Sequence, residues 1–213
     1  MSASQRPPAP RGSREKLPQT PRPAAGRGRA EHTIRIIGGR WRRTVLPVAD
    51  KAGLRPTPDR VRETLFNWLG QDLQGWRCID AFAGTGALGL EAASRGAAEV
   101  VLIEQDAGLL AGLRATVKRL QAEGVQVQAG DALGGLARLP AQAWDLVFLD
   151  PPFDSALFEP ALRLAVQKVP VGGWVYLEAP QAWPQSALAA LELQLYRHLK
   201  AGAVHAHLLQ RIA

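Results

Sequence analysis

Apolar and polar positions follow a repeating pattern over most of the chain. From residue 77 onward, short apolar runs alternate with segments in which apolar side chains recur every three or four residues, which is typical of alternating strands and helices. The predicted strands cover residues 77–83, 99–104, 125–129, 144–149 and 173–178, and the predicted helices cover residues 87–95, 107–122, 132–138 and 155–168. Repeated strand–helix units of this length predict a mainly parallel sheet with helices on both faces.

The C-terminal part changes to a pattern of strands alone. Leu193–Lys200 and Ala203–Ile212 alternate around Ala201-Gly202, which predicts an antiparallel hairpin. Together with the five strands before it, this hairpin gives a sheet of seven strands. The expected fold class is therefore α/β and Rossmann-like, mainly parallel with a C-terminal antiparallel hairpin.

A further helix is predicted just before this region. Thr57 offers a side-chain cap, Pro58 suits the first helical position, and Asp59 places an acid in the positive first turn. Gly70 is suited to end the helix. The apolar residues between them recur at helical spacing, and they are Val61, Leu65, Trp68 and Leu69.

An N-terminal β-hairpin is predicted ahead of this helix. Thr33–Ile37 and Arg40–Leu46 flank Gly38-Gly39, which suits a two-residue turn. Basic side chains interleaved with an aromatic ring suit RNA phosphates and bases. The candidate RNA-binding residues of this hairpin are Arg35, Arg40, Trp41, Arg42 and Arg43, and a core role for Trp41 is the alternative.

Composition excludes several classes of protein. The chain has 213 residues, 46% of them hydrophobic, as in a globular protein with one sizeable core. No apolar stretch is long enough for a membrane span, and the N-terminus carries no apolar signal segment, so we expect a soluble, cytoplasmic protein. Cys78 is the single cysteine, and His32, His198, His205 and His207 lack metal-ligand spacing, so we expect no disulfide and no metal.

The positive charge is concentrated in the first 62 residues. Residues 1–30 carry a net charge of +6 and residues 31–62 carry +5, whereas the rest of the chain carries −4. Such an asymmetry favours a polyanionic partner such as nucleic acid, although a solvated tail is the alternative. We expect three parts: a disordered basic arm over residues 1–30, rich in proline, an Arg-rich hairpin extension over 31–56, and a catalytic domain over 57–213.

A glycine-rich turn follows the first predicted parallel strand. Gly84-Thr85-Gly86-Ala87-Leu88-Gly89 comes directly after the strand that contains Asp80 and Phe82. Ligands of open α/β sheets bind at this place, because glycines let a ligand approach the backbone. The spacing alone also matches a dinucleotide fingerprint.

Three acids at strand ends favour S-adenosylmethionine over a dinucleotide. Asp80 can face an ammonium group, whereas it would repel a pyrophosphate at this turn. Glu104 can accept hydrogen bonds from two ribose hydroxyls, a contact that both cofactor classes share, and Asp131 can accept one from an adenine amino group. Helix capping by Asp131 and ordinary solvation of Glu104 are the structural alternatives.

The strongest chemical signal is Asp150-Pro151-Pro152-Phe153, directly after an apolar strand. The amine of a purine base is a poor nucleophile, because its lone pair is delocalised into the ring. The Asp150 carboxylate and the Pro151 carbonyl can each accept one of its N–H groups and direct the lone pair out of the ring plane. Phe153 can stack on the base, and the prolines stiffen the turn. A simple strand-ending turn is the alternative.

At these residues the chain resembles a known family, the RsmD-type 16S ribosomal RNA (guanine-N2) methyltransferases. The resemblance covers roughly residues 33–212 and implies a Rossmann-like S-adenosylmethionine-dependent methyltransferase fold with an N-terminal hairpin. The segments that carry it are Ile36-Ile37-Gly38-Gly39-x-Trp41-Arg42, Gly53-Leu54-Arg55-Pro56-Thr57, Arg60 to Leu69, Phe82 to Ala92 and Asp150 to Phe153.

The resemblance implies S-adenosylmethionine as methyl donor, S-adenosyl-L-homocysteine as product, and methylation of one guanine in 16S rRNA or the assembling small ribosomal subunit. Asp150 to Phe153 match the catalytic motif, and Arg55 joins the RNA-binding candidates. Positions assigned to the cofactor are Asp80, Phe82, Gly84, Gly86, Glu104, Asp131 and Ala132. We expect a monomer.

Three rival functions differ in substrate or class. Enzymes that methylate DNA adenine or a protein glutamine can share an acid-or-amide-Pro-Pro-aromatic turn. A non-catalytic RNA-binding factor for ribosome assembly could keep the scaffold, although intact Asp150 and Glu104 argue against it. A nicotinamide oxidoreductase could share the glycine turn, and binding of NAD would reveal it.

Overall fold

A computed structural model describes residues 34–47 and 59–213 of the chain. The expected arm over residues 1–30, the RNA-binding candidate Arg55 and the helix-capping pair Thr57-Pro58 lie outside the described residues. Every structural statement below concerns the two described ranges.

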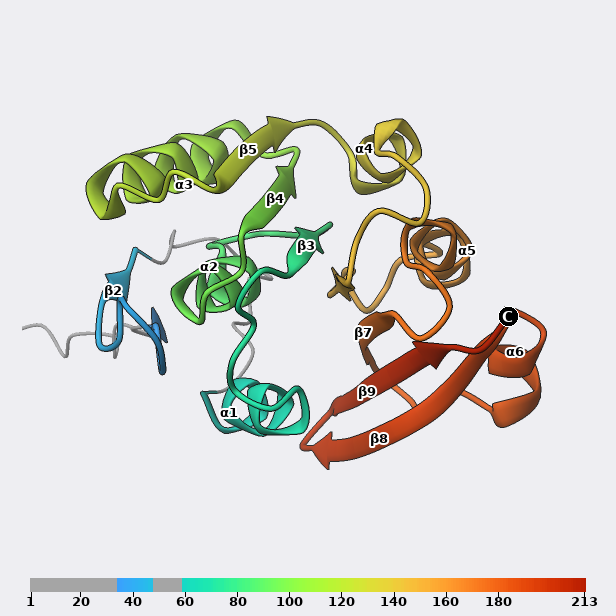
Figure 1. Cartoon of the computed structure of the whole chain (residues 1–213). Helices are drawn as coiled ribbons and strands as arrows, with labels where there is room; N and C mark the ends of the chain where they lie inside the picture. The colour runs from blue at the N-terminus through green and yellow to red at the C-terminus, as the bar shows by residue number, and fades with distance from the viewer. Residues whose placement is uncertain (1–33, 48–58) are drawn as a thin grey trace, which may run out of the picture. The chain divides into compact units, whose positions relative to one another are not determined.

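Seven strands form one sheet in the order β5-β4-β3-β6-β7-β9-β8 (Figure 1). The first five strands in this order run parallel, and β9 pairs antiparallel with both β7 and β8. This arrangement confirms the predicted fold class. The strands are β3 Arg77–Asp80, β4 Glu99–Glu104, β5 Val125–Ala129, β6 Leu146–Leu149, β7 Trp174–Ala179, β8 Leu193–Ala201 and β9 Val204–Arg211.

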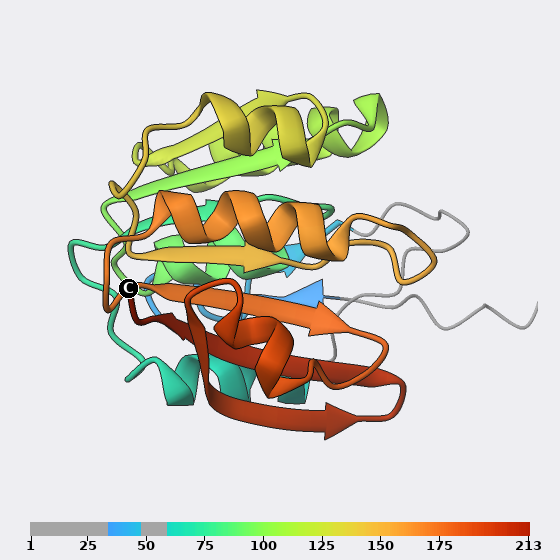
Figure 2. The same ribbon diagram turned by 90° about the vertical axis from the view of Figure 1, so that its right-hand side faces the viewer.

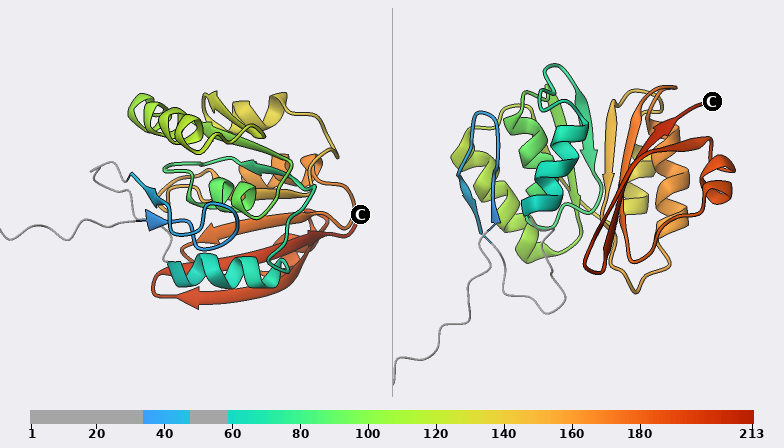
Figure 3. Two further views of the ribbon diagram at one scale, coloured as in Figure 1. Left: turned by 60° about the vertical axis from the view of Figure 1, so that its left-hand side comes forward. Right: turned by 90° about the horizontal axis from the view of Figure 1, so that it is seen from below.

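Helices cover both faces of this sheet, as the right-hand view of Figure 3 shows. On one face pack α1 Asp59–Trp68, α2 Ala87–Ser94 and α3 Ala107–Leu120, and on the other pack α4 Ala132–Arg138, α5 Phe158–Lys168 and α6 Gln185–Ala189. None of the helices in the described ranges is long and apolar enough to cross a bilayer.

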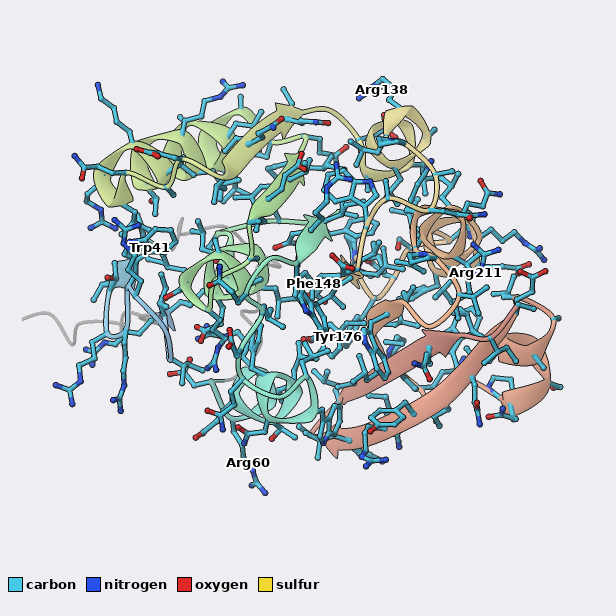
Figure 4. The ribbon with its side chains drawn as sticks, viewed as in Figure 1. Trp41, Arg60, Arg138, Phe148, Tyr176 and Arg211 are labelled. Atoms are coloured by element: carbon cyan, nitrogen blue, oxygen red, sulfur yellow. The ribbon has the colours of Figure 1, made fainter. Side chains whose placement is uncertain are left out.

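Alternation along the strands divides the apolar residues between two cores. Cys78, Phe148 and Tyr176 belong to the core under α1, α2 and α3, whereas their neighbours Ile79 and Val147 belong to the core under α4, α5 and α6. Successive side chains of a strand point to opposite faces, so strands covered on both sides are apolar throughout. The labelled rings of Phe148 and Tyr176 lie close together in Figure 4, with centroids 6.2 Å apart.

The N-terminal segment forms a hairpin, but the predicted two-residue turn is wrong. The strands are only β1 Ile34–Arg35 and β2 Val45–Leu46, and a longer loop joins them. We call residues 38–43 the basic loop. It therefore holds Trp41 and three of the four hairpin arginines, which we had placed on a strand.

Hydrogen bonds to α2 explain the longer loop. The N–H groups of Ile37 and Gly38 donate to the Glu91 carboxylate at 2.7 and 2.8 Å. The Arg40 N–H donates to the Ser94 carbonyl at 2.7 Å, and the Trp41 N–H donates to Ser94 Oγ at 2.9 Å. These backbone groups are satisfied by the helix, so a tight cross-strand turn is not needed to pair them.

Candidate active site

A cavity of about 650 Å³ opens at the carboxyl edge of the parallel strands. Its wall includes the residues that follow β3, β4, β5 and β6, together with Ile34 of β1 and the tip of the β8–β9 hairpin. Figure 2 shows the sheet side on, with the arrowheads of β6 and β7 at the same edge. Strands β4 and β5 lie on one side of β3, and β6 and β7 lie on the other side, so the direction in which strands are added to the sheet reverses at β3. Open α/β sheets bind ligands at this switch point, and the volume suits a small molecule.

Glycines bring the first turn of α2 close to the sheet. Gly84 and Gly86 adopt φ angles of +54° and +81°, which favour glycine. A Cβ on Gly89 would lie 2.2 Å from the Leu102 side chain, so only glycine lets α2 pack this closely on β4. The turn therefore exposes backbone to the cavity and holds the helix against the strands.

Asp80 is a buried carboxylate in the cavity wall. Its Oδ2 accepts a hydrogen bond from the Gly89 N–H at 2.9 Å, while Oδ1 is buried without a hydrogen-bond partner among the described residues. Burial raises the pKa of Asp80 to about 7; the Glu104 and Glu178 carboxylates add to the rise, and the Gly89 and Phe82 N–H groups oppose it. A cation in the adjacent cavity would offset the unfavourable burial of the carboxylate charge. The site therefore fits a ligand with an ammonium group.

Glu104 links two turns at the cavity edge. Its Oε2 accepts from the Gly84 N–H at 2.9 Å, and its Oε1 accepts from the N–H groups of Gln105 and Asp106 at 2.9 and 2.8 Å. An ionised carboxylate has about four acceptor positions, so ribose hydroxyls can share it with these amides. Glu104 thus has a structural role that the sequence analysis did not foresee.

Asp131 is the N-cap of α4. Its Oδ1 accepts a hydrogen bond from the Gly134 N–H at 2.7 Å, which is the helix capping that the sequence analysis named as the structural alternative for Asp131. Asp131 and the following Ala132 also line the cavity. A contact with adenine stays a prediction.

The Asp-Pro-Pro-Phe segment forms another part of the cavity wall. Asp150 follows β6 directly, and Pro151, Pro152 and Phe153 line the same cavity. The Pro152 carbonyl accepts from both the N–H and the hydroxyl of Ser155, at 3.1 and 2.6 Å, and these bonds fix the turn. Phe153 is 36% exposed, so its ring is available to stack on a planar group.

One carboxylate of this wall was missed by sequence reasoning. Glu178 on β7 lines the cavity, although only 2% of its surface is exposed. The available signal was its alternation with Tyr176 near the carboxyl end of a predicted parallel strand. Three carboxylates lie on the strand faces that point toward the core under α1, α2 and α3, as Cys78 does; they belong to Asp80, Glu104 and Glu178. They therefore lie on one side of the sheet.

Comparison with known proteins decides the family. The family Cons_hypoth95, described as "Conserved hypothetical protein 95", matches residues 34–210, which include both walls of the cavity. The chain belongs to this family. This match, together with the curated relatives described next, confirms the resemblance to the RsmD-type family that the sequence motifs indicated.

Relatives of this Cons_hypoth95 member include two curated proteins named "Ribosomal RNA small subunit methyltransferase D". The one from Escherichia coli (strain K12) is 47% identical over 146 residues, covering 68% of this chain and 71% of the relative. The one from Haemophilus influenzae is 44% identical over 140 residues, covering 63% of this chain and 72% of the relative. The solved structure of Escherichia coli yhhF is 38% identical, with a TM-score of 0.72 over 85% of this chain and 99% of that one.

The basic loop lies away from the cavity. It contacts Ser94 and Arg95 at the C-terminal end of α2, whereas the N-terminal end of the helix lines the cavity. Eight helical residues span about 12 Å. Arg35 is nearer, because its neighbour Ile34 is part of the cavity wall. The three arginines of the basic loop therefore lie near the end of α2 that is distant from the cavity, and their role in RNA binding stays a prediction.

Trp41 lies on the inner side of the basic loop. It is partly buried and packs against the core under α1, α2 and α3, which agrees with the alternative of a core role. The guanidinium carbon of Arg40 lies 5.7 Å from the centre of its ring, within the range of a cation–π interaction. Figure 4 labels Trp41 at the hairpin.

The described residues hold no group of three or more His, Cys, Asp or Glu side chains arranged to bind a metal.

Proposed function

We propose that this chain is an S-adenosylmethionine-dependent methyltransferase that methylates the N2 amine of one guanine in 16S ribosomal RNA. The observation that carries the proposal is that Asp150 to Phe153 line the same cavity as the glycine turn. The names of the relatives support ribosomal RNA of the small subunit as substrate. The resemblance supports the guanine N2 atom.

Residues on the glycine-turn side would hold the cofactor. Asp80 would face its ammonium group, Glu104 its ribose hydroxyls and Asp131 its adenine amine, while Gly84 and Gly86 admit it close to the backbone. When bound, S-adenosylmethionine supplies an electrophilic methyl carbon on a positively charged sulfur and is released as S-adenosylhomocysteine. The proposal needs no metal.

Residues on the opposite side would hold the guanine. The Asp150 carboxylate and the Pro151 carbonyl would accept the two N–H groups of the amine, and Phe153 would stack on the base. The lone pair of the nitrogen would form the bond to the methyl carbon as the carbon–sulfur bond breaks, and the electron pair of the broken bond would stay on sulfur. The methylated amine then loses one proton, for which the hydrogen-bonded Asp150 carboxylate is a suitable acceptor.

Positioning would supply most of the rate enhancement. Holding two reactants in line can contribute on the order of 7–11 kcal/mol to lowering the barrier. The rigid Pro-Pro turn and the Ser155 bonds to Pro152 support such alignment, because they fix the acceptors before substrate arrives.

Labelling can test this proposal. The protein is incubated with methyl-labelled S-adenosylmethionine and, separately, naked 16S rRNA, unmodified small-subunit particles, duplex DNA and ribosomal protein, and the labelled product is mapped. We expect label on N2 of one guanine in rRNA or the particle, and at least about 100-fold slower labelling with Asp150→Ala. Label on DNA adenine or on protein would overturn the choice of substrate. Binding of NAD without binding of S-adenosylmethionine would overturn the enzyme class.

A further inference from the structure

Strand β7 places Glu178 beside Asp150. Leu149 of β6 pairs with Leu177 of β7 in parallel register, so the next residues along the two strands, Asp150 and Glu178, are neighbours. Adjacent strands lie roughly 4.8 Å apart. Both side chains also line the cavity proposed for the base. A second carboxylate is therefore available within the span of one purine edge.

An aromatic residue orients this carboxylate. The Tyr176 hydroxyl donates to Glu178 Oε1 at 2.8 Å, and both residues are buried. Burial, followed by the adjacent Glu178 carboxylate, raises the pKa of Tyr176 well above its ordinary value, so the hydroxyl keeps its proton and remains a donor. The Tyr176 ring packs edge-on against Phe148. Because a carboxylate has about four acceptor positions, the tyrosine bond leaves capacity for a ligand.

The hydrogen-bonding edge of guanine matches two neighbouring acceptors. Guanine presents N1–H beside its N2 amine, whereas adenine presents a bare lone pair at N1. We propose that Glu178 determines base specificity by accepting the N1–H of the target guanine while Asp150 holds the N2 amine. This inference rests on the proposed function and adds the residue that selects the base.

Burial makes this acceptor selective. A buried carboxylate is unfavourable unless donors satisfy it, so a base with N1–H is favoured and a base with an N1 lone pair is repelled. Sites built around such a donor can reject an analogue that lacks it by as much as about 10⁴-fold. The competing explanation is that Glu178 only holds Tyr176 in the core. The two explanations differ in how the reaction depends on the N1 proton.

2-Aminopurine separates the amine from the N1 proton. It keeps the 2-amine but carries no hydrogen on N1 and no oxygen on C6, so the effect of Glu178→Gln on the preference, and not the preference alone, assigns the reading of N1 to Glu178. Small-subunit particles are reconstituted with rRNA in which the mapped guanine is either retained or replaced by 2-aminopurine. Methylation kcat/KM is then measured for the wild type, Glu178→Gln and Tyr176→Phe. Glu99→Gln is the matched control, because Glu99 begins β4 at the opposite edge and pairs with Arg77.

We expect the wild type to prefer guanine by at least about 100-fold. Glu178→Gln should lower activity on guanine and reduce the preference at least about tenfold, since its amide can donate to the bare N1 atom. Tyr176→Phe and Glu99→Gln should keep most of the preference. Calorimetric titration with S-adenosylmethionine establishes that each variant is folded.

Two results would overturn the inference. If the wild type methylates 2-aminopurine as well as guanine, no residue reads N1, and this result needs no variant. If Glu178→Gln lowers the rates on guanine and on 2-aminopurine equally, as Tyr176→Phe does, and so leaves the preference for guanine unchanged, Glu178 is only structural. Absence of label on any guanine with the wild type would instead overturn the proposed function itself.

Discussion

Replacing Glu91 by alanine should strongly destabilise the protein. The side chain is fully buried in α2 and accepts hydrogen bonds from the N–H groups of Ile37 and Gly38 at 2.7 and 2.8 Å. It also pairs with Arg95 at 2.8 Å, and the buried Arg62 guanidinium lies 3.7 Å away. Its removal would leave two N–H groups and a buried cation with fewer partners.

The magnitude follows from this burial. Removing one partner of a buried ion pair commonly destabilises a protein by about 3–5 kcal/mol. For a chain of this size, each kcal/mol lowers Tm by about 2–4 °C, so the expected fall is roughly 6–20 °C. Arg62 keeps its bonds to Asp59 and to the Arg35 carbonyl, at 2.6 and 2.9 Å, which favours the lower half of this range.

Urea and thermal unfolding of three variants measure the effect. Glu91→Gln keeps an acceptor oxygen but not the charge, so its loss should be intermediate. Glu159→Ala is the control, because its pair with Arg163 on α5 is exposed and should contribute less than about 1 kcal/mol. If Glu91→Ala unfolds within about 1 kcal/mol of this control, the buried network does not stabilise the fold and the reasoning fails.

Three further predictions concern the site. Asp150→Ala should lower turnover at least about 100-fold while S-adenosylmethionine affinity stays within a few-fold in calorimetry, because a lost transition-state contact spares cofactor binding; near-normal turnover would contradict the mechanism. The raised pKa of Asp80, about 7, means that protonation of this carboxylate favours the folded state. The stability gained from the bound proton is fully present below about pH 4 and is lost as pH rises through 7. The stability of Asp80→Asn in urea unfolding should therefore rise relative to that of the wild type between pH 5 and 8, and a constant difference would refute the shift. Replacing the three arginines of the basic loop by Ala should weaken RNA binding more than it lowers turnover at saturating RNA. By contrast, Arg35→Ala should lower turnover at saturating RNA. Kinetics at several salt concentrations measure both effects, and a larger loss of saturated turnover in the triple variant than in Arg35→Ala would contradict this prediction.

Local sequence predicted the elements whose ends are set by local chemistry. The bounds of β4, β5 and α4 agree with the prediction, and Asp131 caps α4. Strand β3 ends three residues early, at Asp80, because the chain turns away toward the positive-φ glycines. The five-residue helix α6 was missed, since it spans too few residues to show helical spacing.

Tertiary partners account for the remaining differences. Glu91 had the sequence appearance of an ordinary helical acid, yet two of its hydrogen bonds come from residues more than fifty positions earlier, and these two bonds reshape the hairpin. Glu178 lies in an apolar strand, and its relation to Asp150 depends on the β6–β7 register. Neither pairing has a local signal. The cofactor and base-holding candidates were accessible because they occupy strand ends, which the order of elements alone brings to one edge.

The order of strands also has a consequence for biosynthesis. Strand β9 occupies the position between β7 and β8, so β7 has no partner on that side until β9 has been made. During translation, the emerging chain therefore presents an apolar strand with an open edge, a known risk for aggregation. A chain shortened before Val204 would keep this edge open permanently and would also lack the hairpin tip that completes the cavity. Solubility and catalytic competence should thus be acquired together, once β9 has been made and has paired with β7.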